Sequence, residues 1–410
     1  MFPPTSLLTT LLLALSIAAS PVEVRNSPVT LPIVRKLNVS DGTINLLKRD
    51  KSYVVAIQER SFSALDRRDD SVPVTNDAAV GSYIVQVGIG RPATTYNLVV
   101  DTSSSNTWIG ASTPYVKTST SVNTGQLVSF GYGSGAFFGT EYTDAFTLSD
   151  GLIITDQSIG VSSPSMAFGF AGVDGILGLG PVALTEGTLN NQPVTQIPTV
   201  TENLYNQNII SQNVVGISFD PITSLTGTNG ELTFGGTNPA KYTGSIAYTP
   251  ITATFPATFY AGINGSITYG TTTLLSAAGI VNTRTALIYV ATDVFTEYQS
   301  ATCSTLDEAT GLLRITSTQY SALKNLNFEI GSSTYALTPN GQIWPRSLNT
   351  YIGGSSSAIY LIINDIGLPS GQGIDFILGY TFLERFYSVF DTTNSRVGFA
   401  TTKYTNATTN

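Results

Sequence analysis

Two stretches of this 410-residue chain share one plan, in which an apolar β-type run leads directly into a short polar loop. Residues 98–104 read Leu-Val-Val-Asp-Thr-Ser-Ser, and residues 279–285 read Gly-Ile-Val-Asn-Thr-Arg-Thr. Each is followed later by an apolar segment that ends in glycine, at 176–178 and again at 376–379. A unit that occurs twice in the same order predicts two similar lobes with a cleft between them, where the two polar loops meet on a pseudo-two-fold axis.

The composition favours an all-β protein. Charged residues make up only 11% of the chain, and short apolar runs alternate with turns that contain many of the 38 glycines and 19 prolines. We expect helix to be minor, with one helix at 189–207 and a second at 293–301 that is capped by Thr292 or Asp293. The length is sufficient for two domains with substantial cores.

Two absences restrict the chemistry. The chain has no histidine, which excludes Ser-His and Cys-His nucleophile activation as well as histidine bases and metal ligands. Its only cysteine, Cys303, can form no disulfide within the chain, and we expect a buried structural thiol. Acid–base catalysis would therefore rest on carboxylates, and we expect no metal and no cofactor.

The N-terminal region changes character twice. Residues 1–20 carry no charged side chain and contain an apolar run at 7–19, which predicts a secretory signal peptide; a membrane anchor would need a longer apolar span. Residues 21–68 hold nine basic and five acidic residues, whereas 69–410 hold ten and twenty-two. The change falls at Arg67-Arg68, so we expect a basic prosegment at 21–68 that is removed there, the alternative being a solvated charged linker. A mature chain this acidic is a poor candidate for binding nucleic acid or anionic membranes.

The stretch from Leu98 to Trp108 resembles the active-site segment of pepsin-like aspartic proteases (peptidase A1), and secreted fungal acid proteases in particular. The family pattern is hydrophobic-hydrophobic-Asp-Thr-Gly-Ser-Ser-Asn-x-Trp, and Ser103 stands here at the family's glycine. Further matches extend the resemblance over about 80–402. They imply a bilobal fold with an N-terminal lobe at 69–245 and a C-terminal lobe at 246–410, and a monomer. The Gly-rich hairpin at 128–144 is similar to the family's substrate-covering flap, whose residues would be Tyr132, Gly133 and Ser134.

The resemblance also implies site residues, and here the chain departs from the family. Family members hydrolyse peptides with two aspartates that share a proton, so that an acid and a base coexist in one site. Asp101 matches the first aspartate, but Asn282 stands in place of the second, and Arg284 replaces a glycine two residues later. An amide cannot exchange a proton in this pH range, and a guanidinium would pair with Asp101 and block the substrate path. A single sequencing error would explain Asn282 but not Arg284 as well.

Hydroxyl residues of both loops match supporting positions of the family. Thr102 and Thr283 match threonines that hydrogen-bond across the lobes, and Ser104 and Thr285 match residues that hydrogen-bond the outer oxygens of the two aspartates.

Two functions from different classes remain open. The first is a secreted acid endopeptidase that acts on polypeptides. The second is a non-hydrolytic homologue that uses the same cleft to bind a peptide or protein, an inhibitor-like partner or a glycan. Asn282 and Arg284 favour a protein with lost or strongly impaired hydrolysis. If the chain is secreted, N-glycosylation is expected at sequons that begin at Asn38, Asn264 and Asn406.

Overall fold

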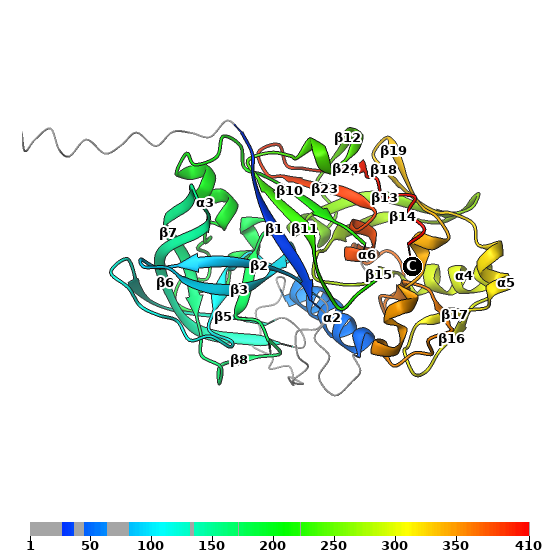
Figure 1. The fold of residues 1–410 in the computed structure, drawn as a ribbon, viewed down its shortest axis with the longest axis horizontal. Coiled ribbons are helices and arrows are strands. Elements are labelled where there is room, and N and C mark those ends of the chain that lie inside the picture. The colour runs from blue at the N-terminus through cyan, green and yellow to red at the C-terminus, as the bar shows by residue number, and fades with distance from the viewer. Residues whose placement is uncertain are drawn as a thin grey trace, which may run out of the picture.

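The computed structural model describes residues 27–36, 45–63, 82–131, 135–170, 172–221 and 223–409. The expected signal peptide at 1–20, the Arg67-Arg68 pair, the flap residues Tyr132, Gly133 and Ser134, and the Asn38 sequon lie outside these residues. The fold is mostly β and bilobal, as the sequence predicts (Figure 1).

In the described residues the strands form three sheets, of which the largest has 14 strands. Its strands in spatial order are β12 (Thr243–Pro250), β24 (Arg396–Thr401), β23 (Phe386–Asp391), β10 (Val214–Phe219), β11 (Thr226–Phe234), β1 (Val29–Lys36), β2 (Ser82–Ile89), β3 (Thr94–Asp101), β9 (Gly175–Gly178), β4 (Trp108–Ile109), β7 (Leu152–Val161), β6 (Ala136–Ser149) and β5 (Val122–Gly131), with β8 (Ala167–Phe168) on β6. A second sheet contains β19 (Ser333–Leu337), β18 (Leu326–Ile330), β13 (Gly262–Tyr269), β14 (Thr272–Val281), β22 (Phe376–Leu378), β15 (Ile288–Val290) and β21 (Ile363–Asp365). The third contains β16 (Thr305–Leu306), β17 (Leu313–Ile315) and β20 (Ile359–Tyr360).

The repeated unit of the sequence folds in the same way in both lobes. In the first lobe, β9 pairs in parallel with β3 and antiparallel with β4. In the second, β22 pairs in parallel with β14 and antiparallel with β15. The glycine that ends each apolar segment is required by close approach: a Cβ would lie 2.4 Å from the Ser105 carbonyl carbon at Gly178, and 2.1 Å from the Leu287 oxygen at Gly379.

Helices are short, apart from one. They are α2 (Leu46–Ser63), α3 (Val200–Asn206), α4 (Thr292–Thr302), α5 (Ser317–Ala322) and α6 (Tyr380–Leu383), with 3-10 turns η2 (Val182–Thr185), η3 (Pro239–Lys241), η4 (Ala257–Phe259), η5 (Asn340–Gln342) and η6 (Arg346–Ile352).

Three local predictions need correction. The helix expected at 189–207 forms only at α3, because Pro193 and Pro198 disfavour helix before it. Helix α4 begins at Thr292, so Ala291 is its N-cap and no side chain caps it; the Thr292 hydroxyl donates to Asp365, and the Asp293 carboxylate accepts from Ser370. The Cys303 thiol is exposed, since this residue lies just past the end of α4, with φ +51°.

The segment that precedes the first lobe is built into the fold. Strand β1 lies between β11 and β2 in the large sheet. Helix α2 follows, and Figure 1 shows it between the strands of the N-terminal lobe on the left and the helical part of the C-terminal lobe on the right. Among the described residues, no helix has both the length and the apolar character needed to cross a membrane.

Candidate active site

Asp101 is the last residue of β3 and is completely buried. Its Oδ1 accepts hydrogen bonds from the Ser103 backbone N–H at 2.9 Å and the Ser103 hydroxyl at 2.7 Å. Its Oδ2 accepts one from the Ser104 hydroxyl at 2.8 Å. The loop after β3 thus supplies donors to both carboxylate oxygens.

Asn282 occupies the equivalent place after β14 and is also completely buried. Its Oδ1 accepts a hydrogen bond from the Arg284 backbone N–H at 2.8 Å, as Asp101 does from Ser103. This contact sets the orientation of the amide, because only the oxygen can accept. In the described part of the chain, neither Asn282 Nδ2 nor the Thr285 hydroxyl has a hydrogen-bond partner. Thr285 matches Ser104, so in the described residues the second loop lacks the hydroxyl bond of the first: the amide nitrogen cannot accept from this hydroxyl and does not donate to it.

Thr102 and Thr283 join the two loops. The backbone N–H of each donates to the hydroxyl of the other at 3.1 Å. The Thr102 hydroxyl then donates to the Val281 carbonyl at 3.2 Å, and the Thr283 hydroxyl donates to the Val100 carbonyl at 3.0 Å. These paired bonds hold Asp101 and Asn282 on adjacent loops at the junction of the lobes.

A residue that the sequence did not single out, Tyr53 of α2, reaches the centre of the site. Its hydroxyl donates to Asp101 Oδ2 at 2.8 Å and lies 2.6 Å from Ser103 Oγ. Burial, and next the Asp101 carboxylate, raise the pKa of this hydroxyl well above its usual value near 10. Tyr53 therefore remains a protonated donor over the whole physiological pH range.

Arg284 completes the centre. Its Nη1 lies 3.8 Å from Asp101 Oδ2, and only 12% of the side chain is exposed. The guanidinium carbon is 4.6 Å from the centre of the Tyr53 ring and 5.0 Å from that of Phe170. The cation is thus close to one carboxylate and two aromatic rings in a water-poor site, which strengthens these interactions.

Helix α2 contacts the second loop one turn before Tyr53. The buried Asp50 Oδ2 accepts hydrogen bonds from the backbone N–H groups of Ala286 at 2.8 Å and Leu287 at 3.1 Å. Arg49 Nε donates to the other Asp50 oxygen at 3.0 Å. Sequence reasoning missed Asp50 and Tyr53, because the only signal was the reversed charge of the region around them.

The cleft around Tyr53 is filled. Only about 10 Å³ of open space remains between α2, Ser103, Tyr260 and residues 130–131 at the end of the flap strand β5. The flap tip itself, where the sequence places Tyr132, lies outside the described residues.

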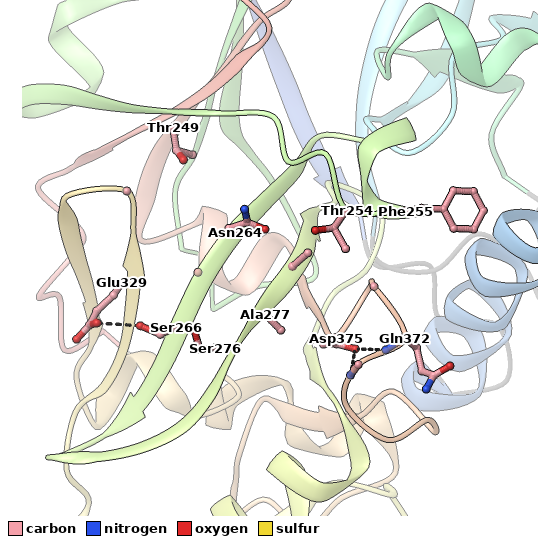
Figure 2. A pocket seen from close by; sticks show the side chains of 15 residues that line it. Thr249, Thr254, Phe255, Asn264, Ser266, Ser276, Ala277, Glu329, Gln372 and Asp375 are labelled. Atoms are coloured by element: carbon pink, nitrogen blue, oxygen red, sulfur yellow. Dashed lines mark hydrogen bonds between the residues drawn. The ribbon is translucent and has the colours of Figure 1, made fainter.

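A larger groove lies in the C-terminal lobe. It has a volume of about 820 Å³ and is lined by residues of β13, β14, β18 and the 371–375 loop, among them the polar Asn264, Glu329 and Gln372 (Figure 2). The Asn264 and Asn406 residues of the two described sequons are both exposed. Within the described residues, no group of three or more acidic or cysteine side chains gathers that could hold a metal ion.

Comparison with known proteins agrees with this architecture. Residues 82–402 match the family model described as eukaryotic aspartyl protease. Polyporopepsin from Irpex lacteus is 59% identical over 342 residues, which cover 83% of this chain and 99% of that protein. Gastricsin from Cavia porcellus is 30% identical over 78% of this chain and 80% of that protein. A crystal structure of an aspartic proteinase from Irpex lacteus matches with a TM-score of 0.80 and 52% identity, covering 94% of this chain and all of that one. The chain belongs to the eukaryotic aspartyl protease family.

Aspartyl proteases act on polypeptides in the cleft between their lobes, and the paired loops of this family member lie at that junction. The family chemistry needs two titratable carboxyl groups that share one proton. This aspartyl protease homologue brings together Asp101, Asn282 and Arg284, which provide one carboxylate, one amide and one cation.

Proposed function

We propose that this chain is a secreted pepsin-like homologue whose peptide hydrolysis is absent or strongly impaired. It is made with a signal peptide at 1–20 and a prosegment at 21–68, followed by lobes at 69–245 and 246–410. N-glycans at Asn264 and Asn406 belong to the same proposal, and the exposure of both side chains supports them. The observation that carries the proposal is the Arg284 guanidinium 3.8 Å from Asp101, opposite an amide instead of a second carboxyl group.

The chemical argument concerns the proton. A water molecule that attacks a peptide carbonyl must lose a proton to one group while another protonates the carbonyl oxygen. Asn282 can do neither, and its Oδ1 already accepts from the Arg284 backbone. Loss of one positioned acid–base group costs about 10²- to 10⁴-fold in rate, and more where the groups act as a unit.

The test is turnover of an acid-denatured protein between about pH 2 and 6, the range in which carboxylate pairs titrate. The wild-type chain is compared with the double variant Asn282→Asp, Arg284→Gly. Both chains are also assayed with the additional change Tyr53→Ala, which removes the phenol from Asp101. We expect activity only in the reverted chains, and its loss when Asp101→Ala is added. A wild-type rate of about 1 s⁻¹ or more, typical of enzymes, would overturn the proposal. Inactive reverted chains would show that these two residues are not the cause.

One observation favours a second function, that of a non-catalytic binder of a peptide or protein. The cleft already holds a polypeptide segment, α2, through the Asp101 side chain of the first loop and a backbone N–H of the second. A homologue that binds such a segment without cleaving it would keep the flap and the two lobes, but it would not need the second catalytic aspartate. In the same assay a binder would hold a peptide in the cleft and release it intact, which mass spectrometry of the peptide detects.

A further inference from the structure

One of the two described glycosylation sequons lies inside the groove of the C-terminal lobe. Residues 264–266 read Asn-Gly-Ser and belong to β13, and Asn264 and Ser266 both line the groove (Figure 2). Strand β13 pairs with β14 on one side and β18 on the other, so the position of Asn264 relative to the groove is fixed. Asn406 lies in the C-terminal tail and is not among the described residues that line the groove.

The Asn264 amide is held in a way that suits an attached glycan. The Thr252 hydroxyl donates to Asn264 Oδ1 at 2.7 Å, and among the described residues no group accepts a hydrogen bond from Nδ2. An N-glycan replaces one hydrogen of Nδ2 and leaves Oδ1 an acceptor. The contact with Thr252 therefore persists after modification and orients the bond to the first sugar.

The floor of the groove is the sheet face formed by β13, β14 and β18, and its side chains are small and polar. Ser266 of β13 lies opposite Ser276 of β14, and its hydroxyl donates to Glu329 of β18 at 2.8 Å. Asn264 is two residues from Ser266, so both side chains lie on the same face of the strand. The resulting volume of about 820 Å³ falls in the range of sites that enclose a small-molecule ligand.

The lining favours a neutral ligand that is rich in hydroxyl groups. The described residues of the groove include two acids, Glu329 and Asp375, and no Lys or Arg, so a phosphate or an acidic peptide would find no cation. An extended peptide would find no free strand edge in the floor, because β13 is paired on both sides. Sugar hydroxyls both donate and accept hydrogen bonds, which matches the hydroxyl, amide and carboxylate groups present.

We propose that the N-glycan on Asn264 folds back into this groove, so that the N-acetylglucosamine pair at its base lies on the floor over Ser266 and Ser276. The inference rests on the proposed secretion and N-glycosylation, and it gives this glycan a binding site on the chain itself. Attachment holds the sugars at an effective concentration of about millimolar or more, so weak contacts are sufficient. The glycan on Asn406 has no such site and extends into solvent.

The test compares the two glycans by their accessibility to endoglycosidase H, which cleaves between the two N-acetylglucosamine residues. The full chain is secreted from a yeast host that attaches oligomannose glycans, and it is digested either native or denatured. Mass spectrometry of the two glycopeptides gives the occupancy and the cleavage rate at each site. In the native protein we expect cleavage at Asn264 to be at least about tenfold slower than at Asn406, because the sugars must first leave the groove. In the denatured chain the two rates should be equal.

A variant that fills the floor tests the position of the glycan. Ser276→Arg places a long side chain in the groove and should raise native cleavage at Asn264 to the rate at Asn406, with unchanged occupancy. Thr273→Arg is the matched control, because Thr273 is exposed on the same strand and is not among the described residues of the groove. Slow cleavage at Asn264 should persist in this control.

Two kinds of result would contradict the inference. An unmodified Asn264 in the secreted chain would overturn it together with the proposed glycan at this residue. A modified Asn264 that is cleaved as fast as Asn406 in the native protein would overturn the binding in the groove alone. The same holds if Ser276→Arg leaves cleavage slow, or if Thr273→Arg accelerates it equally. The assay does not measure peptide hydrolysis, so the proposed loss of that activity is tested separately.

Discussion

At the scale of single residues, the site shows what an amide nitrogen in place of one carboxylate oxygen changes in a buried hydrogen-bond network. Asp101 and Asn282 each accept one backbone N–H from the residue two positions later, so the shared geometry of the loops survives. The two side chains differ in their second polar atom, which is an oxygen in Asp101 and a nitrogen in Asn282. Ser104 donates to Asp101 Oδ2, whereas the Thr285 hydroxyl at the matching position has no hydrogen-bond partner in the described residues. Similar shape therefore preserves the loop but not its hydrogen bonds.

This difference predicts unequal effects of two matched substitutions. Ser104→Ala should lower the free energy of unfolding by about 2 kcal/mol, because it removes a hydrogen bond to a charged group. Thr285→Val, which keeps the shape of the side chain, should change it by less than about 0.5 kcal/mol, because no hydrogen bond is lost. Urea denaturation measures both values.

The control is the same Thr285→Val change in an Asn282→Asp background. There the hydroxyl gains an acceptor, and its removal should cost about 1–2 kcal/mol. If Thr285→Val already costs as much as Ser104→Ala in the wild type, the Thr285 hydroxyl has a partner and the interpretation is wrong.

At the scale of elements, α2 is held to both loops by residues that lie one turn apart on the same helix face. Asp50 accepts backbone N–H groups of the second loop, and Tyr53 donates to Asp101 of the first. The helix thus bridges the two loops.

Removing the first anchor should open the helix. Asp50→Ala leaves two buried N–H groups without their acceptor and removes the carboxylate beside Arg49, at a cost of about 3 kcal/mol. We expect amide hydrogen exchange of α2 to rise about 100-fold, while the exposed neighbour Lys51→Ala leaves it nearly unchanged. Equal exchange rates in the two variants would show that Asp50 does not hold the helix.

Strand β6 contains a buried acidic residue, Glu141, that lies outside the cleft. Glu141 of β6 is 4% exposed; burial raises its pKa to about 7, although a hydrogen bond from Ser158 of β7 acts in the opposite direction. Because the pKa is raised in the folded state, this group contributes stability that is fully present below about pH 4.5, the unfolded value, and is lost as pH rises through 7.

We therefore expect the free energy of unfolding of the wild type to fall relative to Glu141→Gln by about 3 kcal/mol between pH 4 and 8. Denaturant titrations at several pH values measure this difference. The exposed Glu297→Gln on α4 is the control and should show no such trend. A difference that stays constant with pH, or grows in favour of the wild type, would contradict the assignment.

At the scale of the whole molecule, the segment before the first lobe is part of the large sheet. Strand β1 pairs with β11 on one side and β2 on the other, and it carries Arg35 into the interior. Arg35 is completely buried and its Nη1 lies 2.7 Å from Glu384, a residue next to α6. Burial raises the pKa of Glu384, with Arg35 opposing this effect. The two residues are 349 positions apart in the chain, so this pair ties the first described strand to the last part of the fold.

Breaking this pair from one side should be costly. Arg35→Met leaves a buried carboxylate without its cation and should lower the free energy of unfolding by about 3–5 kcal/mol. Adding Glu384→Gln removes the uncompensated charge and should recover at least half of the loss. Urea denaturation of both variants tests this, and a double variant no more stable than Arg35→Met would show that lost packing, not charge, sets the cost.

The sequence by itself determined the all-β character, the two lobes and the loops at Asp101 and Asn282. These features depend on local patterns, in which an apolar run, a polar loop and a glycine follow one another closely along the chain, and such patterns can be read without knowing what lies nearby in space. The proton argument against Asn282 likewise needs only the identity of its side chain.

Only the tertiary structure decided what fills the cleft. Tyr53 and Asp101 are 48 positions apart in the sequence, and Asp50 and Ala286 are 236 apart. No local sequence pattern predicts either contact. The Thr285 hydroxyl without a partner among the described residues, the exposed Cys303 and the helix start at Thr292 were likewise visible only in the structure. Hydrogen bonds and burial depend on distances in space, and these are set only when the whole chain has folded.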